Sequence, residues 1–177
     1  MSLRTKIVAG ALAVSAAGLG FIGFHEGTSY SAYPDPAHGW SVPTICVGHT
    51  GPDVHKGLVA TPAMCEAWLA KDSQKAANAV LECSGQYPLK QHEFDALVSF
   101  TFNVGTGAFC SSTLARMLRD GDRVGAIKQF DRWVYVTRTR NGKWVSIDCR
   151  IRSNNCYGLY TRRMAEKRLF ATGAYHE

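Results

Sequence analysis

Two acidic residues near the start of the chain, Glu26 and Asp35, have types and spacing that allow joint acid–base chemistry. Glu26 follows an uncharged apolar stretch after one intervening residue, and desolvation there favours a protonated carboxyl group. Asp35 lies in the Pro-flanked run Tyr33-Pro34-Asp35, where a carboxylate stays solvated and ionised. Cleavage of a glycosidic bond uses one protonated and one charged carboxyl group. On spacing alone, a surface Glu and a turn Asp are the more common explanation of such a pair.

Further short runs accompany this acid pair in a fixed order. Near it stand Glu26-Gly27, Tyr33-Pro34-Asp35-Pro36 and the run from Thr44 to Gly51. Farther along stand the runs 94–100, 102–105 and 112–114, then Trp133, 158–163, Glu166 and Leu169. This set spans roughly residues 24–172 and resembles the signature of the phage-type lysozymes, glycoside hydrolase family 24. The resemblance implies a muramidase that cleaves the β-1,4 bond between N-acetylmuramic acid and N-acetylglucosamine in peptidoglycan and so lyses the host cell.

The resemblance also implies catalytic roles for three residues. Glu26 would protonate the leaving glycosidic oxygen, Asp35 would support attack by water on the opposite face, and Thr44 would help to place that water. It further implies inversion, for which the two carboxyl groups stand roughly 6.5 to 9.5 Å apart. The family commonly has Thr six residues after the Asp, where this chain has Ser41. Choosing Thr44 instead implies three extra residues among Ala37–Pro43, and we prefer Thr44 because the sequence around it matches the family.

Four more residues are assigned to the substrate-binding cleft by the same resemblance: His49, Asn103, Arg162 and Arg163. Each has a structural alternative. A hydrogen bond within the small lobe is the preferred explanation of His49, and a turn at the cleft floor explains Asn103. The two arginines either contact the peptide stem or buttress the cleft. The histidines and cysteines show no metal-ligand spacing, so neither a metal nor another cofactor is predicted.

The 18 residues from Ile7 to Phe24 are uncharged and follow Arg4 and Lys6. A helix of that length spans about 27 Å, just short of a bilayer core of roughly 30 Å, and its many Gly and Ala residues make it weakly apolar. The charge rule keeps the N-terminus in the cytoplasm and exports the rest. A cleaved signal peptide, a permanent anchor and a buried helix of a soluble protein are alternatives.

The segment is also similar to the signal-anchor-release element of some phage endolysins, and this resemblance favours release. Residues 1–24 would then hold the chain, inactive, in the host inner membrane, before residues 25–177 act in the periplasm as the lysozyme-like domain.

Six cysteines form an even set in a chain with an export-type N-terminus, which favours disulfides, and 15 complete pairings are possible. By position, we expect Cys46 with Cys65, Cys83 with Cys110, and Cys149 with Cys156. The net charge of +6 favours an anionic partner such as a cell-wall polymer, and equally aids solubility. The predicted partner is the glycan strand of peptidoglycan, with no nucleic acid, and the predicted state is a monomer.

The elements that must position these residues follow from local patterns. Gly-, Pro- and Thr-rich residues 27–60 favour a small β lobe, and helices are expected over 61–81, 90–102, 112–119 and 123–133. A turn is expected over 103–107, and a last helix capped by Thr161 and ended by Gly173. Asn141-Gly142 predicts a hairpin joining 134–140 to 143–147. The predicted fold class is therefore α+β and mainly α: lysozyme-like, with an N-terminal β lobe, a helical C-terminal lobe and a late hairpin insertion.

Other classes of function stay open at this stage. A lytic transglycosylase needs one acid and would tolerate loss of Asp35, whereas a non-catalytic wall-binding module would show no turnover. A membrane-permeabilising basic protein would act without Glu26 and depend strongly on salt. The late hairpin could be a clamp over the glycan, a wall-binding element or structural decoration.

Overall fold

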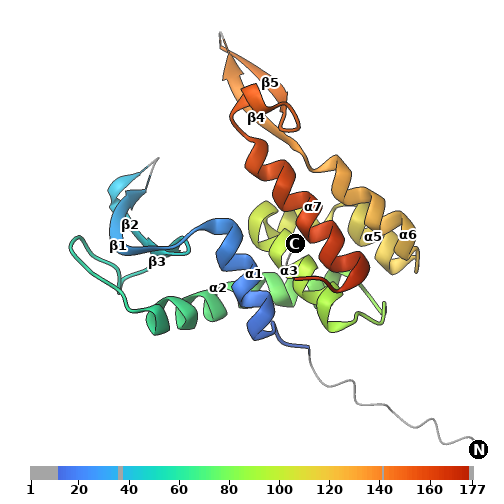
Figure 1. Cartoon of the computed structure of the whole chain (residues 1–177), viewed down its shortest axis with the longest axis horizontal. Helices are drawn as coiled ribbons and strands as arrows, with labels where there is room; N and C mark the ends of the chain where they lie inside the picture. Colours follow the sequence, from blue (N-terminus) through green and yellow to red (C-terminus); the bar gives the residue numbers. More distant parts are fainter. Residues whose placement is uncertain (1–11, 36–37, 141, 176–177) are drawn as a thin grey trace, which may run out of the picture.

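The computed structural model describes residues 12–35, 38–140 and 142–175, with the side chain of residue 140 left aside. A small β lobe and a larger helical lobe are joined by the first two helices, α1 (Ala16–Glu26) and α2 (Pro62–Cys83), as Figure 1 shows. A separate two-stranded hairpin projects from the helical lobe. This architecture is the predicted α+β, mainly helical one.

Helix α1 begins at a well-defined cap. The hydroxyl of Ser15 accepts a hydrogen bond from the backbone N–H of Gly18 and donates one of 2.6 Å to Asp95. Phe21 and Ile22 are buried in the main core, whereas Phe24 is 84% exposed. The C-terminal half of the uncharged segment is thus the first helix of the folded domain, and the predicted boundary between residues 24 and 25 falls inside it.

The β lobe contains β1 (Ser29–Asp35), β2 (Gly39–Cys46) and β3 (His49–Thr50), paired antiparallel in that order. It has its own small core, formed by Ile45, Cys46, Val54, Ala60 and Cys65. The disulfide Cys46–Cys65 crosses this core and ties the end of β2 to α2. The lobe is therefore fixed to the helical part by a covalent bond as well as by packing.

The helical lobe surrounds α3, which is buried continuously from Glu93 to Thr101. After α2, capped by Thr61 as predicted, come α3 (Gln91–Val104), α4 (Thr106–Cys110), α5 (Thr113–Arg119) and α6 (Arg123–Gln129), followed by a 3-10 turn (Phe130–Arg132). The turn expected over 103–107 is shorter than predicted, because α4 begins at Thr106. Cys83–Cys110 joins α2 to α4. Phe94, Phe100, Phe109, Phe130 and Phe170 are all fully buried in its core.

The late part of the chain forms the predicted hairpin and a last helix. Strands β4 (Tyr135–Arg140) and β5 (Lys143–Asp148) pair over six residues each, followed by a second 3-10 turn (Arg152–Asn154). Helix α7 (Tyr157–Thr172) begins four residues before the predicted cap, so the expectation for Thr161 is wrong. Cys156 precedes the helix instead, and its disulfide to Cys149 fixes the start. Gly173 ends the helix as predicted, with a φ of 82°. All three disulfides are the pairs expected from position.

Within residues 12–35, 38–140 and 142–175, no helix has the length and apolar character needed to cross a membrane. The part of the predicted membrane segment before residue 12 lies outside the described residues.

Candidate active site

Glu26 is the last residue of α1, and Gly27 ends the helix with a φ of 74°, which only glycine adopts readily. The carboxylate of Glu26 accepts a hydrogen bond of 2.6 Å from Nη1 of Arg162 on α7. Its side chain is 26% exposed. The prediction of apolar surroundings for Glu26 is therefore wrong, because its side chain forms an ion pair at the junction of the two lobes.

Arg162 is held by a buried polar network. Its Nε donates to Glu166 at 3.0 Å and its Nη2 donates to the carbonyl oxygen of Ser99 at 3.2 Å. The Ser99 hydroxyl donates to the same oxygen of Glu166 at 2.8 Å. Since the Arg162 side chain is only 6% exposed, these bonds fix the guanidinium that contacts Glu26. Arg162 thus buttresses the acid rather than reaching outward.

Arg163 is buried completely and points to another part of the same network. Its Nη2 donates to Asn103 at 2.7 Å, and its guanidinium lies 4.9 Å from the centre of the Phe100 ring. Its Nη1 lies 3.0 Å from Glu166, as a charge contact without hydrogen-bond alignment. Burial lowers the pKa of Arg163 to about 10. With no exposed surface, Arg163 supports the cleft from within, and Asn103 is its partner.

The positive charges of Arg162 and Arg163 are balanced by the negative charges of Glu26 and Glu166. Charged groups away from water need such pairing, because each one alone would lose its hydration without compensation. Glu166 is 0% exposed and contacts both arginines. Glu166 belongs to the family-like residues of the sequence, but no role was predicted for it. Its spacing of three and four residues from Arg163 and Arg162 on one helix was a usable signal for the contact. The contribution of Ser99 had no comparable signal.

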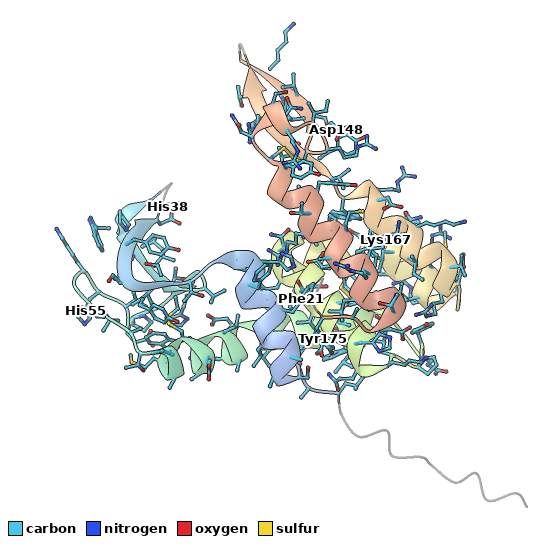
Figure 2. The ribbon with its side chains drawn as sticks, viewed as in Figure 1. Phe21, His38, His55, Asp148, Lys167 and Tyr175 are labelled. Atoms are coloured by element: carbon cyan, nitrogen blue, oxygen red, sulfur yellow. A yellow bond between two sulfur atoms is a disulfide. The ribbon has the colours of Figure 1, made fainter. Side chains whose placement is uncertain are left out.

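Asp35 is the last residue of β1 and lies in the part of the β lobe where Figure 2 labels His38. One carboxylate oxygen accepts the backbone N–H of His38 at 2.8 Å and lies 2.9 Å from Nδ1 of the same residue. The side chain is 28% exposed, so the expectation of a polar, partly solvated carboxylate agrees with its surroundings.

Thr44 lies in β2 opposite Tyr33 of β1. Residues directly opposite in an antiparallel pair share a face, and so do residues two apart on one strand. Thr44 and Asp35 therefore face the same side of the sheet. Thr44 is buried, and its hydroxyl donates to the carbonyl oxygen of Val42 at 3.3 Å.

The register of the sheet explains the alternative position, Ser41. Pro34 pairs with Pro43 and Asp35 with Gly39, so residues 40–42 form a bulge in β2. These are the three extra residues that the choice of Thr44 requires. Ser41 lies within the bulge, exposed, with its hydroxyl donating to the carbonyl oxygen of His38 at 2.5 Å. The bulge supports Thr44 over Ser41.

His49 joins the β lobe to α2. One ring nitrogen lies 2.8 Å from Asp72 of α2 and the other 3.4 Å from Asp53, and the ring stacks on Trp68 at 4.6 Å. The pKa of Asp53 lies below its usual value because of a backbone hydrogen bond within that residue, with smaller contributions from Trp68 and His49. Both ring nitrogens are engaged and the side chain is buried, which supports the structural explanation of His49.

The site thus has two parts. Glu26, Arg162, Arg163 and Asn103 come together at the junction of α1, α3 and α7, whereas Asp35, Thr44 and His49 belong to the adjoining sheet. An acid at the end of the first helix, followed by a strand that ends in a second acid, is the arrangement expected of a lysozyme-type glycoside hydrolase.

Comparison with known proteins agrees with this class. The family model described as Phage lysozyme matches residues 23–166, so the chain belongs to the phage lysozyme family, whose members are muramidase-type glycoside hydrolases. The SAR-endolysin of Escherichia phage Mu is 39% identical over 141 residues, which cover 74% of this chain and 80% of that protein. The SAR-endolysin of Escherichia phage 933W is 35% identical over 182 aligned positions, covering 97% and 96%. The solved endolysin of the Escherichia coli phage FAHEc1 is 33% identical, with a TM-score of 0.77 and coverage of 95% and 99%.

Proposed function

We propose that the chain is an endolysin that lyses the host cell by hydrolysing the β-1,4 bond between N-acetylmuramic acid and N-acetylglucosamine. The observation that carries this proposal is the fixed position of Glu26, held by Arg162 at the junction between the helical lobe and the strand that leads to Asp35. Its relatives named endolysin and its family support the same activity.

In the protonated form of Glu26, one carboxyl oxygen accepts the hydrogen bond from Arg162 and the other donates its proton to the glycosidic oxygen as the bond to the anomeric carbon breaks. A water molecule attacks that carbon from the opposite face, and Asp35 accepts the proton that the water loses. The hydroxyl of Thr44, on the same face of the sheet as Asp35, positions the water. The products are a new reducing end and a free hydroxyl group, and the anomeric configuration is inverted.

The products of digested peptidoglycan test this proposal. Reducing ends with the mass of one added water, and with the α configuration in the first minutes, are expected from the wild-type chain. Asp35→Asn should lower the rate at least about a hundredfold, since it removes one of the two acid–base groups. Anhydro sugar products, or full activity of Asp35→Asn, would establish a lytic transglycosylase instead.

We further propose that residues 1–24 anchor the chain in the host inner membrane until release to the periplasm, with residues 25–177 as the enzyme domain. Helix α1 supports this proposal, because Phe21 and Ile22 are core residues and cannot lie in lipid and in the core together. The neighbouring side of the helix, with Ala17, Gly20 and Phe24, lines a groove against α7. While the segment lies in the membrane, Phe21 and Ile22 are absent from the core, and α1 cannot hold Glu26 in the active site. The chain is proposed to act as a monomer.

The exposed side of α1 allows a clean test of release. A side chain at Gly18 would collide with Asp95, whereas Gly20 has open space and Ala17 is exposed. Replacing Ala17 and Gly20 with Leu should hold the chain in the membrane fraction and delay lysis, because Leu favours the bilayer. The matched pair with Ser should not. Equal membrane retention and equal lysis times for both pairs would contradict the release proposal without affecting the proposed enzyme activity.

A further inference from the structure

The hairpin region carries most of the excess charge of the chain. Residues 135–157 hold five Lys and Arg residues and one Asp, a net charge of +4 out of the +6 of the whole protein. The single acid, Asp148, is occupied by Arg150, whose Nη2 lies 2.6 Å away, and this contact lowers the pKa of Asp148. Lys143 and Arg152 are exposed, so their positive charges reach the solvent.

The strand register divides the hairpin into two faces. Val136 and Ile147 are paired on one face, which turns towards the body at its base, since Ile147 is only 7% exposed. The other face has the pairs Tyr135 with Asp148, Thr137 with Ser146, and Thr139 with Trp144. We call this second set of residues the open face. Trp144 is 77% exposed and Tyr135 46% exposed, and the three hydroxyl residues between them are exposed as well.

An isolated two-stranded hairpin is marginally stable in water, yet this one is fastened firmly at its base. The Cys149–Cys156 disulfide closes the loop that follows β5, and the backbone N–H of Cys149 donates to Val134. Arg138 donates two hydrogen bonds, of 3.0 and 3.1 Å, to the carbonyl oxygens of Asn154 and Asn155. These contacts hold the hairpin, whose second strand ends at Asp148, in one orientation. It points away from the helices (Figure 2). A rigid element that buries little of itself is well suited to present a surface.

The base of the hairpin adjoins the catalytic junction. Helix α7 begins directly after Cys156, and Arg162, the partner of Glu26, lies five residues past Tyr157. Five residues of helix correspond to about 7.5 Å along its axis. The base of the hairpin therefore lies about one and a half helical turns along α7 from the residue that holds Glu26.

We propose that the open face of the β4–β5 hairpin is a second binding surface for peptidoglycan, outside the cleft that cleaves the glycan. The exposed ring of Trp144 stacks on the apolar face of a sugar ring. The hydroxyls of Thr137, Thr139 and Ser146 bind sugar hydroxyl and amide groups, and Tyr135, whose hydroxyl and ring contact Arg150, borders them. By the register, Lys143 lies beside Trp144 on the other face of the hairpin, and Arg152 is exposed after β5. From these two edges of the open face their charges pair with the carboxylates of the peptide stems. This inference rests on the proposed substrate. A lipid surface fits less well, because the tip of the hairpin, Arg140 to Lys143, is charged and polar instead of apolar.

Co-sedimentation with purified, insoluble peptidoglycan tests the proposal directly. The full-length chain is used with Glu26→Gln, so that the wall is not consumed. The hairpin variant adds Trp144→Ser and Lys143→Gln. Its binding should weaken about tenfold or more, as expected for loss of a large aromatic contact and one charge. In the active enzyme the same pair should raise KM for wall fragments and leave kcat nearly unchanged, since the lost contact acts on bound substrate and transition state alike.

A matched control removes an exposed apolar side chain and one positive charge elsewhere, with Val124→Ser and Lys128→Gln on α6. It should bind the wall as the unmodified chain does, and thermal unfolding should show that both variants are folded. Equal binding by the hairpin variant and the control would overturn the proposal. So would an unchanged affinity for the wall with a loss of binding to vesicles of phosphatidylglycerol, which would assign the hairpin to the membrane. Failure of the active enzyme to release reducing ends would count against the proposed activity, separately from these binding results.

Discussion

The molecule contains two small β elements that are fixed in opposite ways. The β1–β2–β3 sheet has its own core, a disulfide to α2 and a histidine bound to Asp72 of α2. The β4–β5 hairpin buries one side chain, Ile147, and depends on a short disulfide loop and surface hydrogen bonds. The first element contains Asp35 and Thr44, whereas the second presents aromatic and basic side chains outward. In the two proposals made above, the sheet serves the chemistry and the hairpin serves capture of the polymer.

The largest expected difference is between two arginines, Arg162 on α7, which holds Glu26, and Arg138 in the hairpin. Arg162→Ala leaves Glu166 buried without its main partner and should cost about 3 to 5 kcal/mol of unfolding free energy. Arg138→Ala removes exposed hydrogen bonds to two carbonyl oxygens and should cost about 1 kcal/mol or less. Urea unfolding of both variants measures this. Similar losses for the two would contradict the distinction between a buried, supporting network and a surface attachment.

The disulfides give the next comparison. Cys46 and Cys65 are 19 residues apart and Cys149 and Cys156 only 7. Loop-closure entropy assigns about 3 kcal/mol to the first bond and slightly less to the second. Replacing each pair by Ala should therefore lower stability by similar amounts. Only loss of Cys46–Cys65 should also lower kcat, because that bond adjoins Thr44. A drop in kcat caused by loss of Cys149–Cys156 alone would mean that the hairpin takes part in the chemistry.

A smaller effect separates Thr44 from Ser41 within the sheet. Thr44→Val keeps the shape of the buried side chain and removes one hydroxyl, so kcat should fall about tenfold, the value of one hydrogen bond. Ser41→Ala, in the exposed bulge, should leave kcat within about twofold. Steady-state kinetics on wall fragments provides the values. The reverse ranking would assign the water-placing role to Ser41.

The smallest effect concerns one carboxylate in each element. The pKa values of Asp53 and Asp148 are both lowered in the folded protein, mainly by hydrogen bonds to backbone and to Arg150 respectively. Each therefore contributes stability that is present above the usual pKa of 3.8 and is lost as the pH falls through the lower folded value. NMR titration below pH 4 should follow the two losses separately, with Asp148 affecting only hairpin signals. A joint transition would show that the two elements are coupled.

The sequence predicted features that depend on local chemistry. The Thr61 cap, the Asn-Gly hairpin, the helix stop at Gly173 and the three disulfides all follow from short-range spacing or chain position. The start of α7 was predicted too late, because the Cys149–Cys156 bond fixes that start and not the Thr161 side chain.

The surroundings of Glu26 could not be predicted in the same way. Its partner Arg162 lies 136 positions later in the chain, and only the fold brings α1 against α7. The apolar residues before Glu26 suggested a desolvated acid, yet its side chain contacts the Arg162 guanidinium and stays partly exposed. The bulge in β2 shows the opposite case, in which a count of extra residues in the sequence anticipated a structural irregularity.

Reducing-end release from purified peptidoglycan by wild-type and Glu26→Gln protein tests the central claim most directly. Glutamine preserves the size of the side chain and its ability to accept a hydrogen bond from Arg162, but it cannot donate the proton to the leaving oxygen. The account predicts that Glu26→Gln, folded as judged by thermal unfolding, loses activity at least about a hundredfold. A folded Glu26→Gln protein that releases reducing ends at the wild-type rate would contradict it.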